Sequence, residues 1–185
     1  MEHFDKNKNM DFEIFKENIR NVPNFPKKGI QFKDVTTLFK NAEAFSLLSD
    51  EVYNEYKDKG ITKVVGIESR GFIMGPVLSN RLGVGFVPVR KSGKLPCDVY
   101  EETYEKEYGI DVIQIHKDAL SENDVVVLHD DLLATGGTML AVCRLMKHFN
   151  VKKIYVNFLI ELEDLKAREL FDENVEILSL IKYPI

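Results

Sequence analysis

Several runs of β-branched and other apolar residues in this chain are not interrupted by polar residues, and they restrict the fold more than any other feature. The clearest are "KVVGI" at 63–67, "VVVL" at 125–128 and "IYVNFLI" at 154–160. The last of these contains a single polar residue, Asn157. A strand with one face in water alternates apolar and polar residues, so unbroken runs indicate strands that are covered on both faces. Such strands form parallel sheets with helices packed on both sides.

Patterns of helical spacing separate these runs along the chain. Apolar residues recur at helical spacing over 42–60, 71–83 and about 138–149, and shorter helices are predicted at 11–21 and 164–171. Further strands are expected at 85–89, 111–116 and 175–181, with a short extended piece at 29–35. We therefore predict a single α/β domain over 1–185, with a doubly wound, mostly parallel sheet flanked by helices.

The composition limits the possible partners. The net charge is -5 over 185 residues, and nucleic-acid binders usually carry a basic stripe and a basic pI. The only cysteines, Cys97 and Cys143, have no further cysteine or histidine at metal-ligand spacing. No apolar run approaches the roughly 20 residues of a membrane helix, and the start "MEHFDKNKNM" is unlike a signal peptide. We expect a cytoplasmic protein with a small substrate, no nucleic-acid partner and no membrane contact.

The segment "VVVLHDDLLATGGTML" at 125–140 combines a buried strand, a glycine-rich turn and the start of a helix. It lacks the lysine of a nucleotide P-loop and the glycine spacing of a dinucleotide-binding turn. Backbone N–H groups at a helix N-terminus, together with the hydroxyls of Thr135 and Thr138, suit a single phosphate group. Because ligands bind at the carboxyl ends of parallel strands, this turn lies where a site is expected.

Two aspartates, Asp130 and Asp131, directly precede this turn. Carboxylates accept hydrogen bonds, so their natural partners are a vicinal diol or a cation. A ligand with a phosphate next to a ribose diol meets both demands. The alternative is structural, with Asp131 or Thr135 capping the helix that follows.

The segment "HDDLLATGGT" resembles the binding motif for phosphoribosyl diphosphate (PRPP) of the type I phosphoribosyltransferases, in the form typical of members that act on adenine. Further segments at 24–39, 66–96 and 102–120 resemble the same family in the same order, so the similarity extends from about Ile19 to the C-terminus. The resemblance implies transfer of phosphoribosyl from PRPP to adenine in purine salvage, giving AMP and pyrophosphate with Mg²⁺ as cofactor. It also implies a homodimer, and a small N-terminal hood over 1–40 that binds the base. The polar stretch at 97–109 is long for a plain connection and is predicted to be a mobile lid loop, as in the family.

The resemblance assigns roles to individual residues. It implies that Mg²⁺ is bound through PRPP rather than directly by side chains. The 5′-phosphate is assigned to Ala134, Thr135, Gly136, Gly137 and Thr138, and the ribose hydroxyls to Asp130 and Asp131. The pyrophosphate is assigned to Ser69, Arg70, Arg90, Lys91 and Lys94, with Arg70 acting in catalysis. The base is assigned to Phe32 and Leu132, which would sandwich it, and to main-chain groups around Gln31 and Lys33. The lid contributes Tyr108 and Glu107, the latter as general acid/base among the nearby Glu101, Glu102 and Glu105.

The chain departs from the family pattern at Lys28, Lys33 and Thr37, where proline, arginine and proline are common. Other readings also stay open at this stage. The chain could act on another base, such as hypoxanthine, xanthine or orotate, or it could be a non-catalytic regulator that senses PRPP. A plain small-molecule binding module is the third alternative. The form "DDLLATGGT" favours adenine, and the segment before Pro23 is too short for a winged-helix DNA-binding module.

Overall fold

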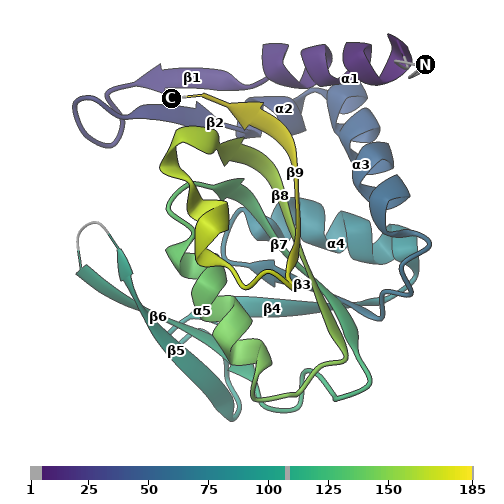
Figure 1. Ribbon diagram of the computed structural model, residues 1–185, viewed down its shortest axis with the longest axis vertical. Coiled ribbons are helices and arrows are strands. Elements are labelled where there is room, and N and C mark those ends of the chain that lie inside the picture. Colours follow the sequence, from purple (N-terminus) through teal and green to yellow (C-terminus); the bar gives the residue numbers. More distant parts are fainter. Residues whose placement is uncertain (1–5, 107–108, 185) are drawn as a thin grey trace.

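A computed structural model describes residues 6–106 and 109–184, and a seven-stranded sheet lies at its centre (Figure 1). The strand order is β5-β6-β4-β3-β7-β8-β9. The strands are β3 (Lys63–Ile67), β4 (Gly85–Lys91), β5 (Val99–Lys106), β6 (Gly109–His116), β7 (Val125–Leu133), β8 (Lys153–Leu162) and β9 (Glu176–Tyr183). Five neighbouring strands, from β4 to β9 in this order, are parallel, whereas β6 and β5 are antiparallel additions beside β4. The prediction of a mostly parallel sheet is confirmed.

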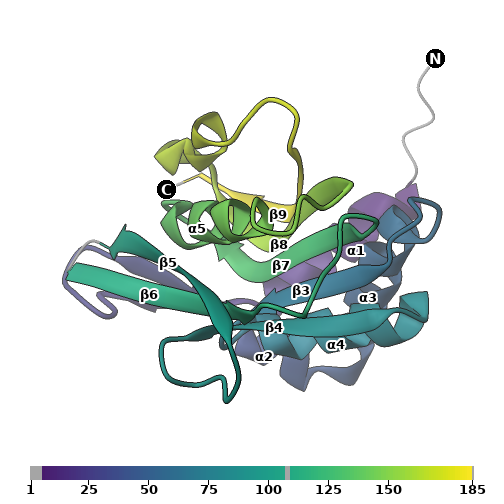
Figure 2. The same ribbon diagram turned by 90° about the horizontal axis from the view of Figure 1, so that it is seen from below.

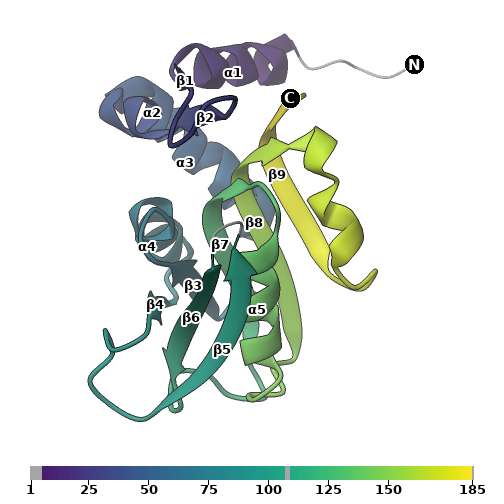
Figure 3. The same ribbon diagram turned by 90° about the vertical axis from the view of Figure 1, so that its left-hand side faces the viewer.

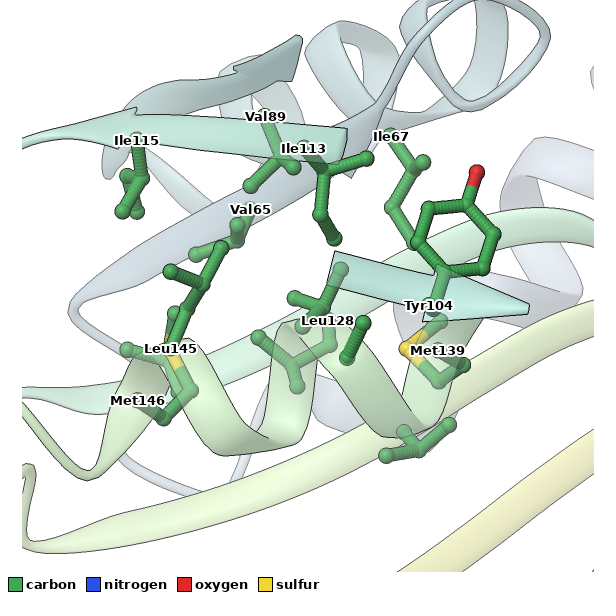
Figure 4. Packing of buried hydrophobic residues seen from close by; sticks show 14 of the residues in the cluster. Val65, Ile67, Val89, Tyr104, Ile113, Ile115, Leu128, Met139, Leu145 and Met146 are labelled. Atoms are coloured by element: carbon green, nitrogen blue, oxygen red, sulfur yellow. The ribbon is translucent and has the colours of Figure 1, made fainter. Parts of the chain in front are cut away.

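Helices cover both faces of this sheet (Figures 2 and 3). Helices α3 (Ala42–Tyr56) and α4 (Gly71–Leu82) lie on one face, and α5 (Gly137–Met146) lies on the other. Alternate residues of β3 confirm this, because Val64 packs with the α3 and α4 side and Val65 packs with α5. Figure 4 shows the α5 side, where Val65, Leu128 and Leu145 form part of one apolar cluster. Both faces of the sheet are therefore apolar, which explains the unbroken strand sequences.

The N-terminal part forms a separate small layer beside the C-terminal end of β9 (Figure 1). It contains α1 (Lys6–Glu17), the antiparallel pair β1 (Arg20–Pro23) and β2 (Gln31–Asp34), and α2 (Thr36–Lys40). The prediction of a helix over 11–21 is wrong at its C-terminal end, because Arg20 begins a strand. Pairing of Val22 with Phe32 provides hydrogen bonds that a local helical pattern cannot reveal.

Within the described residues, most of the segment at 97–109 that was predicted to be a loop forms a strand. Residues 99–106 form β5, which pairs along its whole length with β6. The side chains of Tyr100, Glu102 and Tyr104 are buried or half-buried, while those of Glu101 and Glu105 are exposed. This period of two is the pattern of an edge strand, and its inward positions hold tyrosine and glutamate rather than aliphatic residues.

The C-terminal connection also differs from the prediction. Instead of one helix at 164–171, two short 3-10 helices, η1 (Glu163–Leu165) and η2 (Ala167–Leu170), follow β8. Lys166 separates them in a left-handed conformation. Across residues 6–106 and 109–184, no helix is long and apolar enough to cross a membrane.

Candidate active site

The carboxyl ends of β4, β3 and β7 are neighbours, because β3 pairs with β4 on one side and with β7 on the other. Ser69 and Arg70 follow β3, Arg90 and Lys91 end β4 with Lys94 shortly after it, and the turn at 134–138 follows β7. The sheet therefore brings together three of the segments predicted to bind the ligand. Strand β7 is longer than predicted and ends at Leu133, so both aspartates lie inside the strand.

The turn at 134–138 leads directly into helix α5. Gly136 is the N-cap of α5 with φ 81°, a left-handed conformation that favours glycine. No side chain caps this helix, so the alternative role of Asp131 or Thr135 as a cap is wrong. The first N–H groups of α5 are thus free of a side-chain acceptor from the cap position, as a phosphate-binding turn requires.

Asp130 and Asp131 occupy a site that disfavours their ionisation. Burial raises the pKa of Asp130 well above its ordinary value, and the charge of Asp131 raises it further. Burial also raises the pKa of Asp131, although the Arg70 guanidinium opposes this effect. The Asp131 N–H donates to Oδ1 of Asp130 at 2.9 Å. A half-buried carboxylate next to a buried one, Asp130 beside Asp131, is costly unless a ligand donates hydrogen bonds to them, which is typical of a binding site.

Arg70 connects this aspartate pair to the N-terminal layer. Its Nε lies 3.1 Å from Oδ2 of Asp131, and its guanidinium lies over the ring of Phe32, 5.3 Å from the ring centre. Arg70 is also the N-cap of α4 and directly follows Ser69 in the same turn. A single side chain therefore contacts residues that were assigned separately to the ribose and to the base.

Gly71 allows this close approach between α4 and β7. A Cβ atom at Gly71 would lie 2.7 Å from the carbonyl oxygen of His129 and 3.5 Å from Oδ1 of Asp130. Such a contact with backbone is closer than real Cβ atoms tolerate, so any larger residue would push α4 away from the aspartates. The glycine after Arg70 thus sets the distance between Arg70 and Asp131.

The basic residues after β4 are organised by Glu68, which the sequence analysis missed. Oε2 of Glu68 accepts from Nε of Arg90 at 3.2 Å and from the N–H of Lys91 at 3.1 Å. Burial alone would raise the pKa of Glu68, but these donors lower it below its ordinary value. Arg90 also donates to the carbonyl of Lys94 at 3.2 Å, so Glu68 and Arg90 hold the two loops together. In the sequence, Glu68 comes directly after β3 and "RKSGK" begins at the end of β4. Only the order of the strands in the sheet reveals that the two are neighbours.

The predicted base-binding residues lie on β2 and β7. Phe32 is half-buried, packs edge-on against Phe25 at 5.2 Å between ring centres, and belongs to neither core cluster. Leu132 is half-buried beside the core on the α3 and α4 side. The exposed Gln31 accepts a hydrogen bond from the side chain of Asn21 at 2.9 Å. The structure thus leaves Phe32 available to a ligand and does not use it as core.

Two of the departures from the family pattern have partners in this structure. The ammonium of Lys33 lies over the ring of Tyr183, 4.4 Å from its centre, and attaches β2 to the end of β9. The hydroxyl of Thr37 donates to the carbonyl of Asn18 at 2.6 Å and accepts from the N–H of Arg20 at 3.2 Å. Lys28 is exposed in the turn between β1 and β2. Both contacts lie at the open end of the hairpin, opposite its turn, and attach it to the end of β9 and to the residue that follows α1.

Strand β7 also carries a buried histidine that the sequence analysis did not single out. Nδ1 of His129 lies 2.7 Å from Oδ1 of Asn157 on β8, and both side chains are fully buried. Burial lowers the pKa of His129 to about 4, so the ring is neutral at physiological pH. This neutral pair lies in the sheet directly before Asp130 and adds no charge to the site.

The predicted lid residues Glu107 and Tyr108 lie outside the described residues. Of the other lid glutamates, Glu101 and Glu105 are exposed, whereas Glu102 forms an ion pair with Arg144 of α5 at 3.0 Å. Within the described parts of the chain, no group of three or more histidine, cysteine or acidic residues could hold a metal ion.

Comparison with known proteins agrees with this arrangement. The model of the phosphoribosyl transferase domain matches residues 35–179. Adenine phosphoribosyltransferase from Bacteroides fragilis is 62% identical over 174 residues, covering 93% of this chain and 98% of the relative.

Solved structures of the same enzyme have the same fold. The crystal structure of adenine phosphoribosyltransferase from Rhodothermus marinus matches with a TM-score of 0.89 and 43% identity, over 95% of this chain and 99% of that one. The enzyme from Saccharomyces cerevisiae, in complex with an imino-altritol bisphosphate and adenine, matches with a TM-score of 0.87 and 38% identity, over 93% and 99% of the two chains. The chain belongs to the adenine phosphoribosyltransferase family of the phosphoribosyl transferases.

Proposed function

We propose that this protein transfers the phosphoribosyl group from PRPP to adenine, producing AMP and pyrophosphate in purine salvage. The observation that carries the proposal is the pair of the half-buried Asp130 and the buried Asp131, which lies just before an uncapped helix N-terminus and is joined to Arg70 through Asp131. A phosphorylated ribose presents hydroxyl donors and a phosphate at that spacing. The family relationship supports adenine as the base, since the Saccharomyces cerevisiae relative was crystallised with it.

The sugar phosphate would be bound by the end of β7 and the start of α5. The turn at 134–138 would hold the 5′-phosphate through main-chain N–H groups and the hydroxyls of Thr135 and Thr138. Asp130 and Asp131 would accept hydrogen bonds from the ribose hydroxyls and fix the orientation of C1′ toward the attacking nitrogen of the base. Burial of the two carboxylates makes them strong acceptors once the ligand has replaced water.

The pyrophosphate would lie over the loops after β3 and β4. Breaking the bond between C1′ and pyrophosphate creates negative charge on the leaving group, and preorganised cations stabilise that charge in the transition state. Ser69, Arg70, Arg90, Lys91 and Lys94 would surround it. Glu68 keeps Arg90 and the Lys91 backbone in place before the ligand arrives.

Mg²⁺ fits this site as an ion held mainly by the substrate. The residues that the structure describes contain no cluster of three or more potential metal ligands, and a magnesium ion commonly takes one or two carboxylates and completes its shell with phosphate oxygens and water. When bound, the ion would neutralise charge on the pyrophosphate. The protein's own contribution is to bind the ribose and to surround the phosphates with cations.

The base would bind against β2 and β7. Phe32 and Leu132 would contact its two faces, and main-chain groups around Gln31 and Lys33 would read its polar edge. We further propose that residues 1–40 act as a base-binding hood, and that residues 97–109 shield the reaction from water. Glu107 would handle the purine proton and Tyr108 would contribute to the closed site.

Two further proposals concern the whole protein. The free thiols of the exposed Cys97 and the half-buried Cys143 favour a reducing compartment, which supports a cytoplasmic location. The resemblance to the family supports a homodimer, which sedimentation of the purified protein would test.

The function is tested by mixing the protein with PRPP, Mg²⁺ and one nucleobase at a time. We expect kcat/KM for adenine to exceed that for hypoxanthine by at least about a hundredfold, because a mismatched polar edge leaves buried groups unpaired. Comparable values for the two bases would contradict the assignment of adenine. Binding of PRPP without turnover of any base would instead indicate a regulator.

A further inference from the structure

Strand β5 lies along helix α5 on the face of the sheet that carries the phosphate-binding turn (Figure 3). The two elements run in opposite directions, so the end of β5 lies next to the start of α5. Their contacts are distributed along this length. Glu102 and Thr103 contact the C-terminal half of the helix, and Glu105 contacts its first residue.

At the start of α5, the backbone of β5 lies close to the turn that is proposed to bind phosphate. A Cβ atom at Gly137 would lie 3.3 Å from the carbonyl oxygen of Glu105, which is tighter than most real Cβ contacts. The preceding residue, Tyr104, is only 7% exposed and belongs to the same apolar cluster as Met139 of α5 (Figure 4). Strand β5 therefore forms one wall of the turn that would hold the 5′-phosphate.

Near the other end of α5, a single arginine fixes β5 against the helix. Nε of Arg144 lies 3.0 Å from Oε2 of Glu102, and its Nη2 donates to the carbonyl oxygen of Thr103 at 3.3 Å. The guanidinium thus binds a side chain and a main-chain group of consecutive residues. Such a planar fork fixes the position of the strand along the helix, which a single flexible charge would not do.

We propose that Arg144 is a positioning residue for PRPP, acting through β5 on the turn at 134–138. It lies in the last turn of the helix, away from the residues assigned to the ligand, and it contacts Glu102 and Thr103 of β5. By holding Glu102 and Thr103, it keeps the Glu105 backbone beside Gly137 and so maintains the shape of the turn. The inference rests on the proposed function, because the turn must bind the phosphate of PRPP.

The test is steady-state kinetics of Arg144→Gln and Glu102→Gln with each substrate varied in turn. We expect KM for PRPP to rise about three- to tenfold in both variants, the range for loss of a charge-assisted, partly exposed contact. KM for adenine should stay within about twofold, because the base contacts lie on other segments. The double variant should be no worse than Arg144→Gln, since both changes remove one shared interaction.

A matched control is Arg81→Gln. Arg81 forms an ion pair with Asp50 at 2.6 Å on α4 and α3, and its side chain is exposed to a similar degree. This variant loses a comparable surface ion pair and should leave KM for PRPP unchanged. An equal rise in both KM values for Arg144→Gln, the same rise in Arg81→Gln, or an increase in kcat would overturn the proposal.

Hydrogen exchange gives a second readout that does not depend on turnover. Amides of β5 and β6 should exchange faster in Arg144→Gln than in the wild type, while those of α5 remain unchanged. Faster exchange throughout the protein would mean general destabilisation and would overturn the proposal. Failure of the wild type to form AMP would refute the proposed function instead, so the two failures are distinguishable.

Discussion

Asp130 and Asp131 lower the stability of the folded protein, and the proposed function gives them a role in ligand binding. Both carboxylates are placed where burial raises their pKa, and the ordinary hydration of an aspartate is lost. The folded protein therefore binds protons at Asp130 more readily than the unfolded chain does. As the pH rises above the ordinary pKa of an aspartate, the free energy of unfolding therefore falls. The loss of stability is greatest at a pH at which Asp130 must ionise in the folded protein.

We predict that Asp130→Asn raises thermal stability while it weakens PRPP binding. The amide removes the buried charge, so Tm should rise by about 2–4 °C for each kcal/mol gained in a protein of this size. The gain should be larger at about pH 8 than at about pH 4, where the folded protein keeps the carboxyl protonated and the unfolded chain has ionised only about half of it. Thermal melts at both pH values and calorimetric titration with PRPP provide the measurement. Lower stability at both pH values would contradict this account.

Residue type and spacing alone indicated candidate ligand residues only where these are adjacent in the sequence. Asp130, Asp131 and the turn at 134–138 form one local pattern, so spacing and residue type were sufficient. Glu68 and Arg144 were missed because each acts through a partner far away in the chain, in the "RKSGK" loop or on β5. A single acid or arginine has no local signature, and only the strand order supplies its partner.

Among the elements, strand β5 differs most from its prediction. Its inward positions alternate as in a strand, but they are occupied by polar or aromatic residues, so the segment was predicted to be a loop. The same limit applies to β1, whose hydrogen bonds come entirely from β2. Elements with strong apolar periodicity, such as α3 and β7, were predicted correctly because their own residues determine burial.

The glutamates of β5 provide the control for a test of Glu107 as the general acid/base. Glu107→Gln should lower kcat by about 10²- to 10⁴-fold, the range for loss of general acid–base catalysis, with little change in KM for PRPP. Glu105→Gln is the matched control, because Glu105 lies two residues earlier in the chain with an exposed side chain and should be nearly silent. Glu102 is unsuitable as a control, since it binds Arg144.

Steady-state kinetics beside a thermal melt would compare the two variants. If Glu105→Gln proves to be the damaging change, the assignment within the hairpin is wrong. If neither variant loses activity, the purine proton is transferred by another group.

For the whole molecule, the parallel sheet and its covering helices could be predicted, but the order of the strands could not. The order brings β3 between β4 and β7 and thereby creates the site. It also buries His129 in the sheet, next to Asn157 on β8. The burial of His129 therefore depends on the assembled sheet, and its ionisation affects the stability of the whole protein.

We predict that His129 makes the fold sensitive to acid. The unfolded chain takes up a proton at this residue below about pH 6.5, whereas the folded protein resists protonation until about 4. The unfolded state binds more protons in this window, so stability falls as the pH falls through it, by roughly 3 kcal/mol at most. His129→Gln, which stays neutral, should lose less stability between about pH 7 and 4.5 in urea titrations. Equal losses in both proteins would refute the prediction.

The position of β5 at the edge of the sheet has one more consequence. An edge strand exposes unpaired main-chain groups, which are a template for pairing with other chains. Glu102 on this strand is paired with Arg144, whereas Glu101 and Glu105 have exposed side chains. Their like charges repel an approaching copy of the same strand. The acidic sequence that suggested a lid thus also protects the protein from edge-to-edge aggregation.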